Sequence, residues 1–353
     1  MHRSNSNPRR TWSWNHRRSM VLAALSVAIA STACSSSPEP ASAAAAPAAP
    51  APAEVAPATL RVGSFTSDQN GFDTTSYWVD TGKEVVVFDA QFTAKHAREV
   101  VDAIRKSTSS RIRFLVLTHP NPDKFNGASV FRDLGAEVVA SRATADAIPK
   151  VHAYKRHFFV EVAKMIPAHA YPEQPIVDRT FEGELRLPTD AGEIVLRELR
   201  HSGVSSTQTV GWAKEARALF VGDLVHHGAH AWLEGGVATG APKPDIAAWI
   251  AALDELRSFE GATVHGGRGA SAPVEDAVAA QQAYLRRADA IVHDYVRELG
   301  ARRSELGGPK SQGHHAALAK RFEKEFPERK LSYLVQYGVY GLLGKVAGES
   351  SAL

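Results

Sequence analysis

Three side chains that can bind a metal ion lie at alternate positions directly after one apolar segment. Residues 114–117 are β-forming and apolar, and they predict a buried strand. His119, Asn121 and Asp123 follow, with a proline after each of the first two. In an extended backbone alternate side chains point to one side, and prolines stiffen the chain. The spacing predicts a metal-binding loop, although a polar turn after a core strand is the alternative for any single histidine.

This strand and loop resemble the signature of the metallo-β-lactamase superfamily, in which His-x-His-x-Asp-His follows a buried strand. Two positions depart from it: Asn121 replaces the second histidine, and Lys124 replaces the last one. The resemblance covers roughly residues 60–268. It implies an α/β fold, the four-layer αβ/βα sandwich of that superfamily, with two mixed sheets face to face, helices outside and the site at one sheet edge.

The resemblance also implies ligands from three later segments, each following an apolar run. Each match is weak alone, but all three occur in the family's order, which is a stronger signal. They are His201 in Arg-His-Ser-Gly, Asp223 in Val-Gly-Asp and His265 in Val-His-Gly-Gly.

The two metal positions implied by the resemblance differ in ligand chemistry. One set, Asp123, Asp223 and His265, is complete and carries two carboxylates. The other contains a neutral amide, which is a poor zinc ligand. We therefore expect one tightly bound Zn²⁺ and a second, weak site, with Asp123 orienting a zinc-bound hydroxide. The weak set consists of His119, Asn121 and His201.

Lys124, His226 and His227 are candidates for substrate binding. A lysine beside Zn²⁺ is repelled unless it points away, loses its charge or pairs with an anionic substrate. The two histidines follow Asp223 on a Gly-flanked loop together with His230, where they could contact substrate or a second metal ion. An exposed histidine cluster is the alternative for all three.

The N-terminus is typical of an exported protein. Residues 1–34 contain five arginines and no acid, and their apolar run 20–30 is shorter than the roughly 20 residues of a spanning helix. Residues 17–21 resemble a twin-arginine signal. Cys34 ends a segment that resembles a lipoprotein cleavage box, so we expect a periplasmic protein lipid-anchored at Cys34, with an ordinary signal peptide as the alternative. Residues 35–58, mostly Ala, Pro and Ser, predict a disordered tether.

Charge and cysteine content exclude two classes of partner and site. The chain has 41 Lys and Arg against 38 Asp and Glu, and removing the five arginines of residues 1–34 leaves 41 − 5 = 36 basic side chains. A nearly neutral mature chain gives no electrostatic reason to expect nucleic-acid binding. Because Cys34 is the only cysteine, disulfides and thiolate zinc sites are excluded.

The resemblance implies a metallo-β-lactamase-like domain over residues 59–300, and the sequence after it predicts a helical extension over 301–353. Asp89, which ends a predicted strand, resembles the residue that braces the metal loop, with a helix N-cap or turn as the alternative. Residues 143–169 are predicted to be helical, either as a lid over the site or as a helix packed on the core. The predicted helices are 93–107, 128–134, 245–258 and 274–299, and the predicted strands include 85–89, 137–140, 180–187, 193–199, 209–212, 218–223 and 262–267.

Together these features imply a zinc-dependent hydrolase that cleaves an ester, lactone or amide bond of a small molecule, β-lactams included. The alternative is a degenerate binding lipoprotein of the same fold, in which Asn121 and Lys124 have ended catalysis. Redox or sulfur chemistry at a single metal is a third class, which a His-rich site without cysteine disfavours. The zinc content of the protein separates the first two.

Overall fold

The computed structural model describes residues 60–349. The predicted export signal, the tether and the lipid-anchor residue Cys34 lie outside the described residues. None of the helices in residues 60–349 is long and apolar enough to cross a membrane.

Two mixed β-sheets form the centre of the described part of the chain. One sheet, here called sheet A, runs in the order β1 to β6, and the other, sheet B, runs from β12 to β7. The strands of sheet A are β1 (Arg61–Thr66), β2 (Thr75–Asp80), β3 (Glu84–Phe88), β4 (Arg111–Val116), β5 (Glu137–Ser141) and β6 (Arg179–Phe181). Those of sheet B are β7 (Glu184–Thr189), β8 (Gly192–Glu198), β9 (Thr209–Ala213), β10 (Ala218–His227), β11 (Thr263–Gly269) and β12 (Ala272–Pro273).

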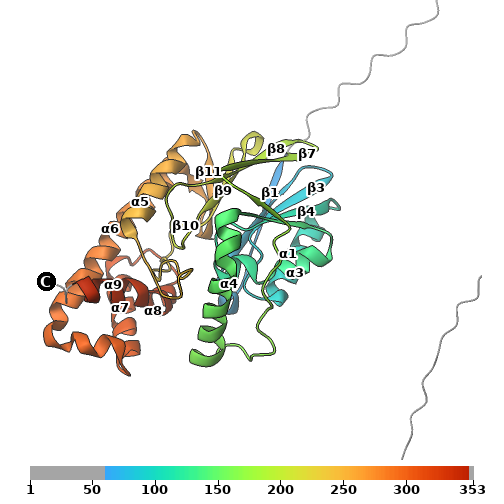
Figure 1. The fold of residues 1–353 in the computed structure, drawn as a ribbon. Helices are drawn as coiled ribbons and strands as arrows, with labels where there is room; N and C mark the ends of the chain where they lie inside the picture. The colour runs from blue at the N-terminus through green and yellow to red at the C-terminus, as the bar shows by residue number, and fades with distance from the viewer. Residues whose placement is uncertain (1–59, 350–353) are drawn as a thin grey trace, which may run out of the picture. The chain divides into compact units, whose positions relative to one another are not determined.

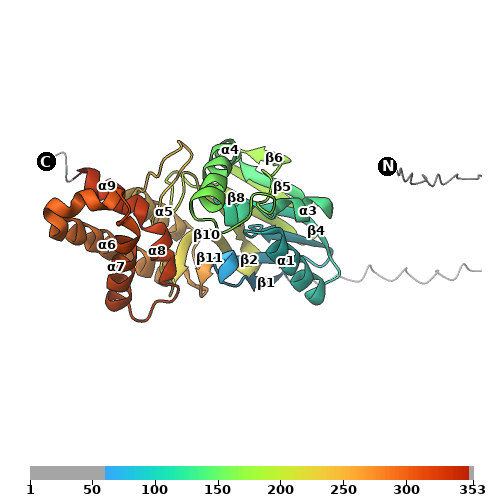
Figure 2. The ribbon, with the colours of Figure 1, turned by 90° about the horizontal axis from the view of Figure 1, so that it is seen from below.

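Helices cover the outer face of each sheet. Figures 1 and 2 show α1, α3 and α4 against sheet A, and α5 and α6 against sheet B. Helix α4 continues into a π-helical turn, Phe158–Val162, and α6 continues into a 3-10 helix, Gly300–Gly307. The helices are α1 (Ala94–Ser107), α2 (Pro122–Phe125), α3 (Ala128–Asp133), α4 (Arg142–His157), α5 (Ile246–Glu255), α6 (Val274–Leu299), α7 (Ser311–Glu325), α8 (Tyr333–Gly338) and α9 (Tyr340–Glu349).

The alternation of side chains along β3 explains the four layers. Val85 and Val87 pack outward against the cluster beneath α1, α3 and α4. Val86 and Phe88 point the other way, into a cluster shared with sheet B. A strand with apolar residues on both faces must be covered on both, and here it is covered by helices on one side and a second sheet on the other. The predicted αβ/βα sandwich is confirmed.

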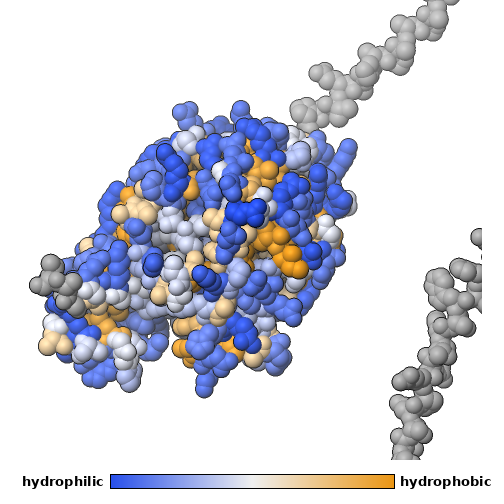
Figure 3. Space-filling view, viewed as in Figure 1, coloured by the Kyte–Doolittle hydropathy of each residue, from blue (hydrophilic) through white to orange (hydrophobic). Residues whose placement is uncertain are grey.

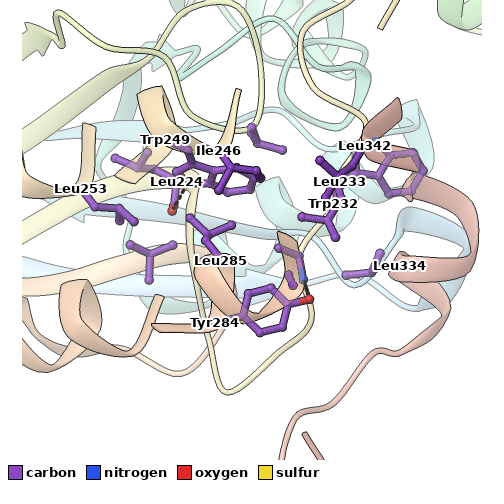
Figure 4. Close-up of a cluster of buried hydrophobic side chains, with 14 of the residues drawn as sticks. Leu224, Trp232, Leu233, Ile246, Trp249, Leu253, Tyr284, Leu285, Leu334 and Leu342 are labelled. Carbon is purple, nitrogen blue, oxygen red and sulfur yellow. Dashed lines mark hydrogen bonds between the residues drawn. The ribbon is translucent and has the colours of Figure 1, made fainter. Parts of the chain in front are cut away.

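The C-terminal helices pack on the sheet B side of the same core. Figure 4 shows Leu342 of α9 beside Trp232 and Leu233, and the amide of Leu342 donates to the carbonyl of Leu233 at 3.1 Å. The Arg329 side chain donates to the carbonyl of His226, near the end of β10, and to that of Ala229, just after the strand. Residues 300–349 therefore share one hydrophobic cluster with sheet B.

One predicted strand, 180–187, is divided in the structure. Gly183 has a φ of +66°, which turns the chain between β6 and β7. The two strands lie in different sheets, so this glycine marks the point where the chain passes from sheet A to sheet B.

Replacing Gly211 by alanine should destabilise the protein by about 1–3 kcal/mol, because overpacking forces neighbouring groups apart. A Cβ at this position of β9 would lie 2.1 Å from the Phe88 ring, where the two sheets meet. Urea unfolding measures the effect. The control is Gly313→Ala in α7, where a Cβ meets no atom within 4 Å, and that variant should be neutral or stabilising. Equal stabilities for both variants would contradict this close packing.

Candidate functional site

The chain after β4 forms a short helix instead of an extended loop. Asn121 has extended backbone angles (φ −115°, ψ 148°), and Pro122 follows it as the first residue of α2. Proline is favoured at that position because its φ suits a helix and its missing N–H is not needed. The predicted extended loop is therefore wrong. Asp123 and Lys124 approach the site from a helical turn.

Lys124 is fully buried between two carboxylates. Its Nζ lies 2.9 Å from Asp123 Oδ2 and 2.8 Å from Asp223 Oδ1, with Asp89 at 4.0 Å. Burial lowers the pKa of Lys124, but the three carboxylates, Asp123 first, outweigh it and raise that pKa above its usual value. Lys124 is thus a buried ammonium. Its expected role in substrate binding stays a prediction, since in this structure its ammonium is paired with Asp123 and Asp223.

Arg268 binds the same two carboxylates. Its Nη1 donates to Asp223 Oδ2 at 2.6 Å, and its Nη2 donates to Asp123 Oδ2 at 3.0 Å. Further bonds run to Thr74 Oγ1 at 2.9 Å and to the Phe72 carbonyl at 2.7 Å. Burial raises the pKa of Asp223, but Arg268 and then Lys124 overcome this and hold it well below its usual range. Two carboxylates and two cations form one buried cluster.

Arg268 was missed in the sequence, although a signal was present. It precedes Gly269 in β11, and the family resemblance places a histidine before a glycine there. The chosen histidine, His265, comes too early in the strand. It pairs with Phe220 of β10, whereas Arg268 pairs with His226, beyond Asp223.

The structure does not bring His265 or His201 to the carboxylates, which corrects both assignments as ligands. The His265 ring stacks on Phe220, and its Nδ1 lies 2.8 Å from Ser271 Oγ. His201 is exposed, with its Nδ1 2.8 Å from Glu255 Oε1. Both rings are engaged in local contacts away from Asp123 and Asp223.

His119 is the predicted histidine ligand that does reach the cluster. Its Nε2 lies 3.9 Å from Asp223 Oδ2, and its Nδ1 lies 2.9 Å from Thr118 Oγ1. Burial lowers the pKa of His119 to about 4, so its ring is neutral near pH 7. Asn121 is nearly buried and borders a small cavity beside Asp123.

The histidines after Asp223 do not contact this cavity. His226 is completely buried, packs near Trp249, and has a pKa lowered by burial to about 3. His230 is buried against Tyr284. Neither they nor the partly buried His227 are among the described residues that line the cavity. The substrate contacts expected of His226 and His227 stay a prediction, which this cavity does not support.

Aromatic side chains close the cavity above the cluster. Phe72 and Phe92 meet edge to face at 4.9 Å, and Phe159, from the π-helical turn after α4, contacts both. The remaining volume is about 30 Å³, which is room for roughly one water molecule. Residues 143–169 thus combine both predicted roles, since they pack on the core and cover the site.

Zinc does not fit these residues. Both carboxylates are already bound by Lys124 and Arg268, and of the predicted histidines His119 alone is near them. Within residues 60–349, no group of three or more His, Cys, Asp or Glu side chains is arranged to hold a metal ion. The side chains gathered here form a cluster of salt bridges and not a set of metal ligands.

Asp89 braces the site from β3, as the resemblance predicts. Its Oδ1 accepts hydrogen bonds from the Thr118 amide and hydroxyl, each at 2.9 Å. Burial raises the pKa of Asp89 to about 7. An unfolded aspartate ionises near 4. The folded state therefore keeps a proton that the unfolded state loses, and this contribution to stability falls as pH rises from about 4 through 7.

Replacing Asp89 by asparagine should flatten that dependence, because asparagine keeps an acceptor for Thr118 and does not titrate. The measurement is the urea midpoint at pH 5 and at pH 8 for both proteins. The wild type should lose more stability than Asp89→Asn on going from pH 5 to pH 8. Equal losses would contradict the raised pKa.

The model of the metallo-beta-lactamase superfamily matches residues 70–268. Solved structures with a similar fold include a metallo-beta-lactamase from Pontibacter korlensis, 19% identical with a TM-score of 0.47, covering 65% of this chain and 95% of that one. Another is the metallo-beta-lactamase FIM-1 from Pseudomonas aeruginosa in its mono-zinc form, 16% identical with a TM-score of 0.47, covering 65% and 91%. No curated protein sequence matches this chain.

Proposed function

The chain belongs to the metallo-beta-lactamase superfamily, and we propose that it uses this metal-dependent hydrolase fold for a metal-free, non-hydrolytic binding role. The observation that carries the proposal is the position of the Lys124 ammonium between Asp123 and Asp223. Those two carboxylates are the ones that the family resemblance assigns to the metal.

The charges of the cluster support this proposal. Lys124 and Arg268 supply two positive charges against the two carboxylates of Asp123 and Asp223, all deeply buried. A zinc ion would have to displace both cations, and breaking one buried ion pair costs about 3–5 kcal/mol. The cluster is therefore stable without metal and resists exchange for it.

The site also lacks the space and the free carboxylate that a zinc hydrolase needs. A zinc hydrolase needs an open coordination position for water and space for a substrate. The cavity beside Asp123 holds about 30 Å³, and Asp123 itself accepts from Arg268 and Thr74. Burial raises the pKa of Asp123, but Lys124 and Arg268 outweigh it and hold that pKa below its usual value, so this carboxylate is a poor base.

A hydrolase screen of the full-length protein tests this role. Nitrocefin, a γ-lactone and an acyl thioester are offered in buffer with and without added zinc, and hydrolysis is followed against buffer alone. The expected result is no turnover above the control for any of the three. Turnover that Asp223→Ala abolishes would overturn the proposal.

Export and lipid anchoring remain part of the proposal and rest on sequence. Lipidation of Cys34 would hold the folded domain at a periplasmic membrane through the Ala/Pro-rich segment 35–58. Cys34→Ala should move the protein from the membrane fraction to the soluble periplasmic fraction. Unchanged fractionation would contradict the anchor.

A further inference from the structure

A groove of about 780 Å³ lies between the end of α4 and the C-terminal helices. It lies apart from the Lys124 cluster, with no lining residue in common among those described. Figure 3 shows the surface hollowed between the end of α4 and the C-terminal helices. The volume is within the range of small-molecule sites, about 300–1,000 Å³. Its walls come from segments as distant in sequence as Phe158 and Gly348.

Glycines leave open space along one wall. Gly344 and Gly348 lie one turn apart on α9, and a Cβ at either position would meet no atom within 4 Å. Glycine inside a helix is about 1 kcal/mol less favourable than alanine. Nothing in the described chain packs on these two positions, so a bound molecule can approach the helix backbone closely.

His315 supplies a polar group directed to the groove. Its side chain is buried, with 8% of the residue exposed, yet neither ring nitrogen has a hydrogen-bond partner among residues 60–349. Its ring contact is with Tyr340, at 6.4 Å between centroids. Burial and the neighbouring His314 lower the pKa of His315, so the ring can donate from one nitrogen and accept at the other.

The charge and shape of the walls define the ligand. Among the described lining residues there is no Asp or Glu, whereas Arg303 contributes a cation and Gln312 and Gln336 contribute amides. The stacked rings of Phe158 and Tyr340, 6.1 Å apart and inclined by 10°, form a flat apolar surface. We propose that this groove binds a small amphipathic organic carboxylate, with its apolar body on the aromatic wall and its anionic head toward Arg303 and His315.

Isothermal titration of the full-length protein with dodecanoate tests the proposal. Dodecyltrimethylammonium, which has the same tail and the opposite charge, is the comparison ligand. We expect saturable dodecanoate binding and binding of the cationic probe at least about tenfold weaker. No dodecanoate binding at millimolar concentration, or equal binding of both probes, would overturn the proposal.

Two substitutions locate the site. Gly344→Leu fills the groove, and His315→Ala removes the polar contact; each should weaken dodecanoate binding by about tenfold or more. The matched control is Gly313→Leu, because Gly313 is also a helical glycine with open space around it but does not line the groove. Circular dichroism melting confirms that all three fold. Equal binding by Gly344→Leu and Gly313→Leu would place the carboxylate elsewhere and overturn the assignment. Because zinc content and hydrolysis are separate measurements, this result does not depend on the role proposed above.

Discussion

Replacing Lys124 by methionine should destabilise the fold by about 3–5 kcal/mol, the usual effect of leaving a buried charge without its partner. Methionine matches the length of lysine, so packing changes little while the ammonium is lost. The two carboxylates of Asp123 and Asp223 would then be paired with a single cation, the guanidinium group of Arg268, in a region with almost no solvent. The free energy of urea unfolding at pH 7 measures the loss.

The control for this variant is Lys95→Met. Lys95 also forms an ion pair, with Glu99 at 3.5 Å, but its side chain is 65% exposed. Such surface pairs contribute about 0–1 kcal/mol. If Lys124→Met were as stable as this control, the buried cluster could not be the centre of the site.

The double variant Lys124→Ala/Arg268→His should bind zinc where the wild type does not. It removes both cations, frees the carboxylates of Asp123 and Asp223, and introduces an imidazole at the end of β11 beside them. His119 Nε2, 3.9 Å from Asp223, is a further donor. Zinc at about 100 times its dissociation constant would stabilise this variant by roughly 3 kcal/mol. The measurement is thermal unfolding with and without zinc.

Loss of four Arg268 hydrogen bonds can leave the double variant partly unfolded without metal. Circular dichroism during zinc addition therefore gives a second readout, since a created site would restore folding. The single variant Arg268→His is the control, because Lys124 still occupies the carboxylates and should keep zinc out. Equal responses to zinc in the single and double variants would show that Lys124 does not block the metal position.

The fold was largely predictable because its signals are local. The helix expected at 274–299 is α6 with the same bounds, since its apolar residues recur with helical spacing over a long segment. The apolar run ending before Asp89 likewise gave β3. Each pattern depends on neighbouring residues alone, which a single sequence contains.

The site was predictable only in part because it depends on register between distant strands. His265 and Arg268 lie three residues apart near the end of one predicted strand and both precede a glycine, so the local pattern does not show which of them reaches the site. The pairing of β11 with β10 decides which of the two residues reaches the site, because it places Arg268 opposite His226. Lys124 was recognised as a departure from the family pattern, but its burial between two carboxylates is a tertiary property.

Zinc titration of the purified wild-type protein shows whether the position between Asp123 and Asp223 holds a metal ion or the Lys124 ammonium. The sequence alone implied one tight zinc at Asp123, Asp223 and His265, whereas the structure fills that position with Lys124 and Arg268. We expect no saturable zinc binding by calorimetry at micromolar protein, and no zinc retained through gel filtration by elemental analysis. One zinc per chain, retained by the wild type and lost in Asp223→Ala, would contradict it.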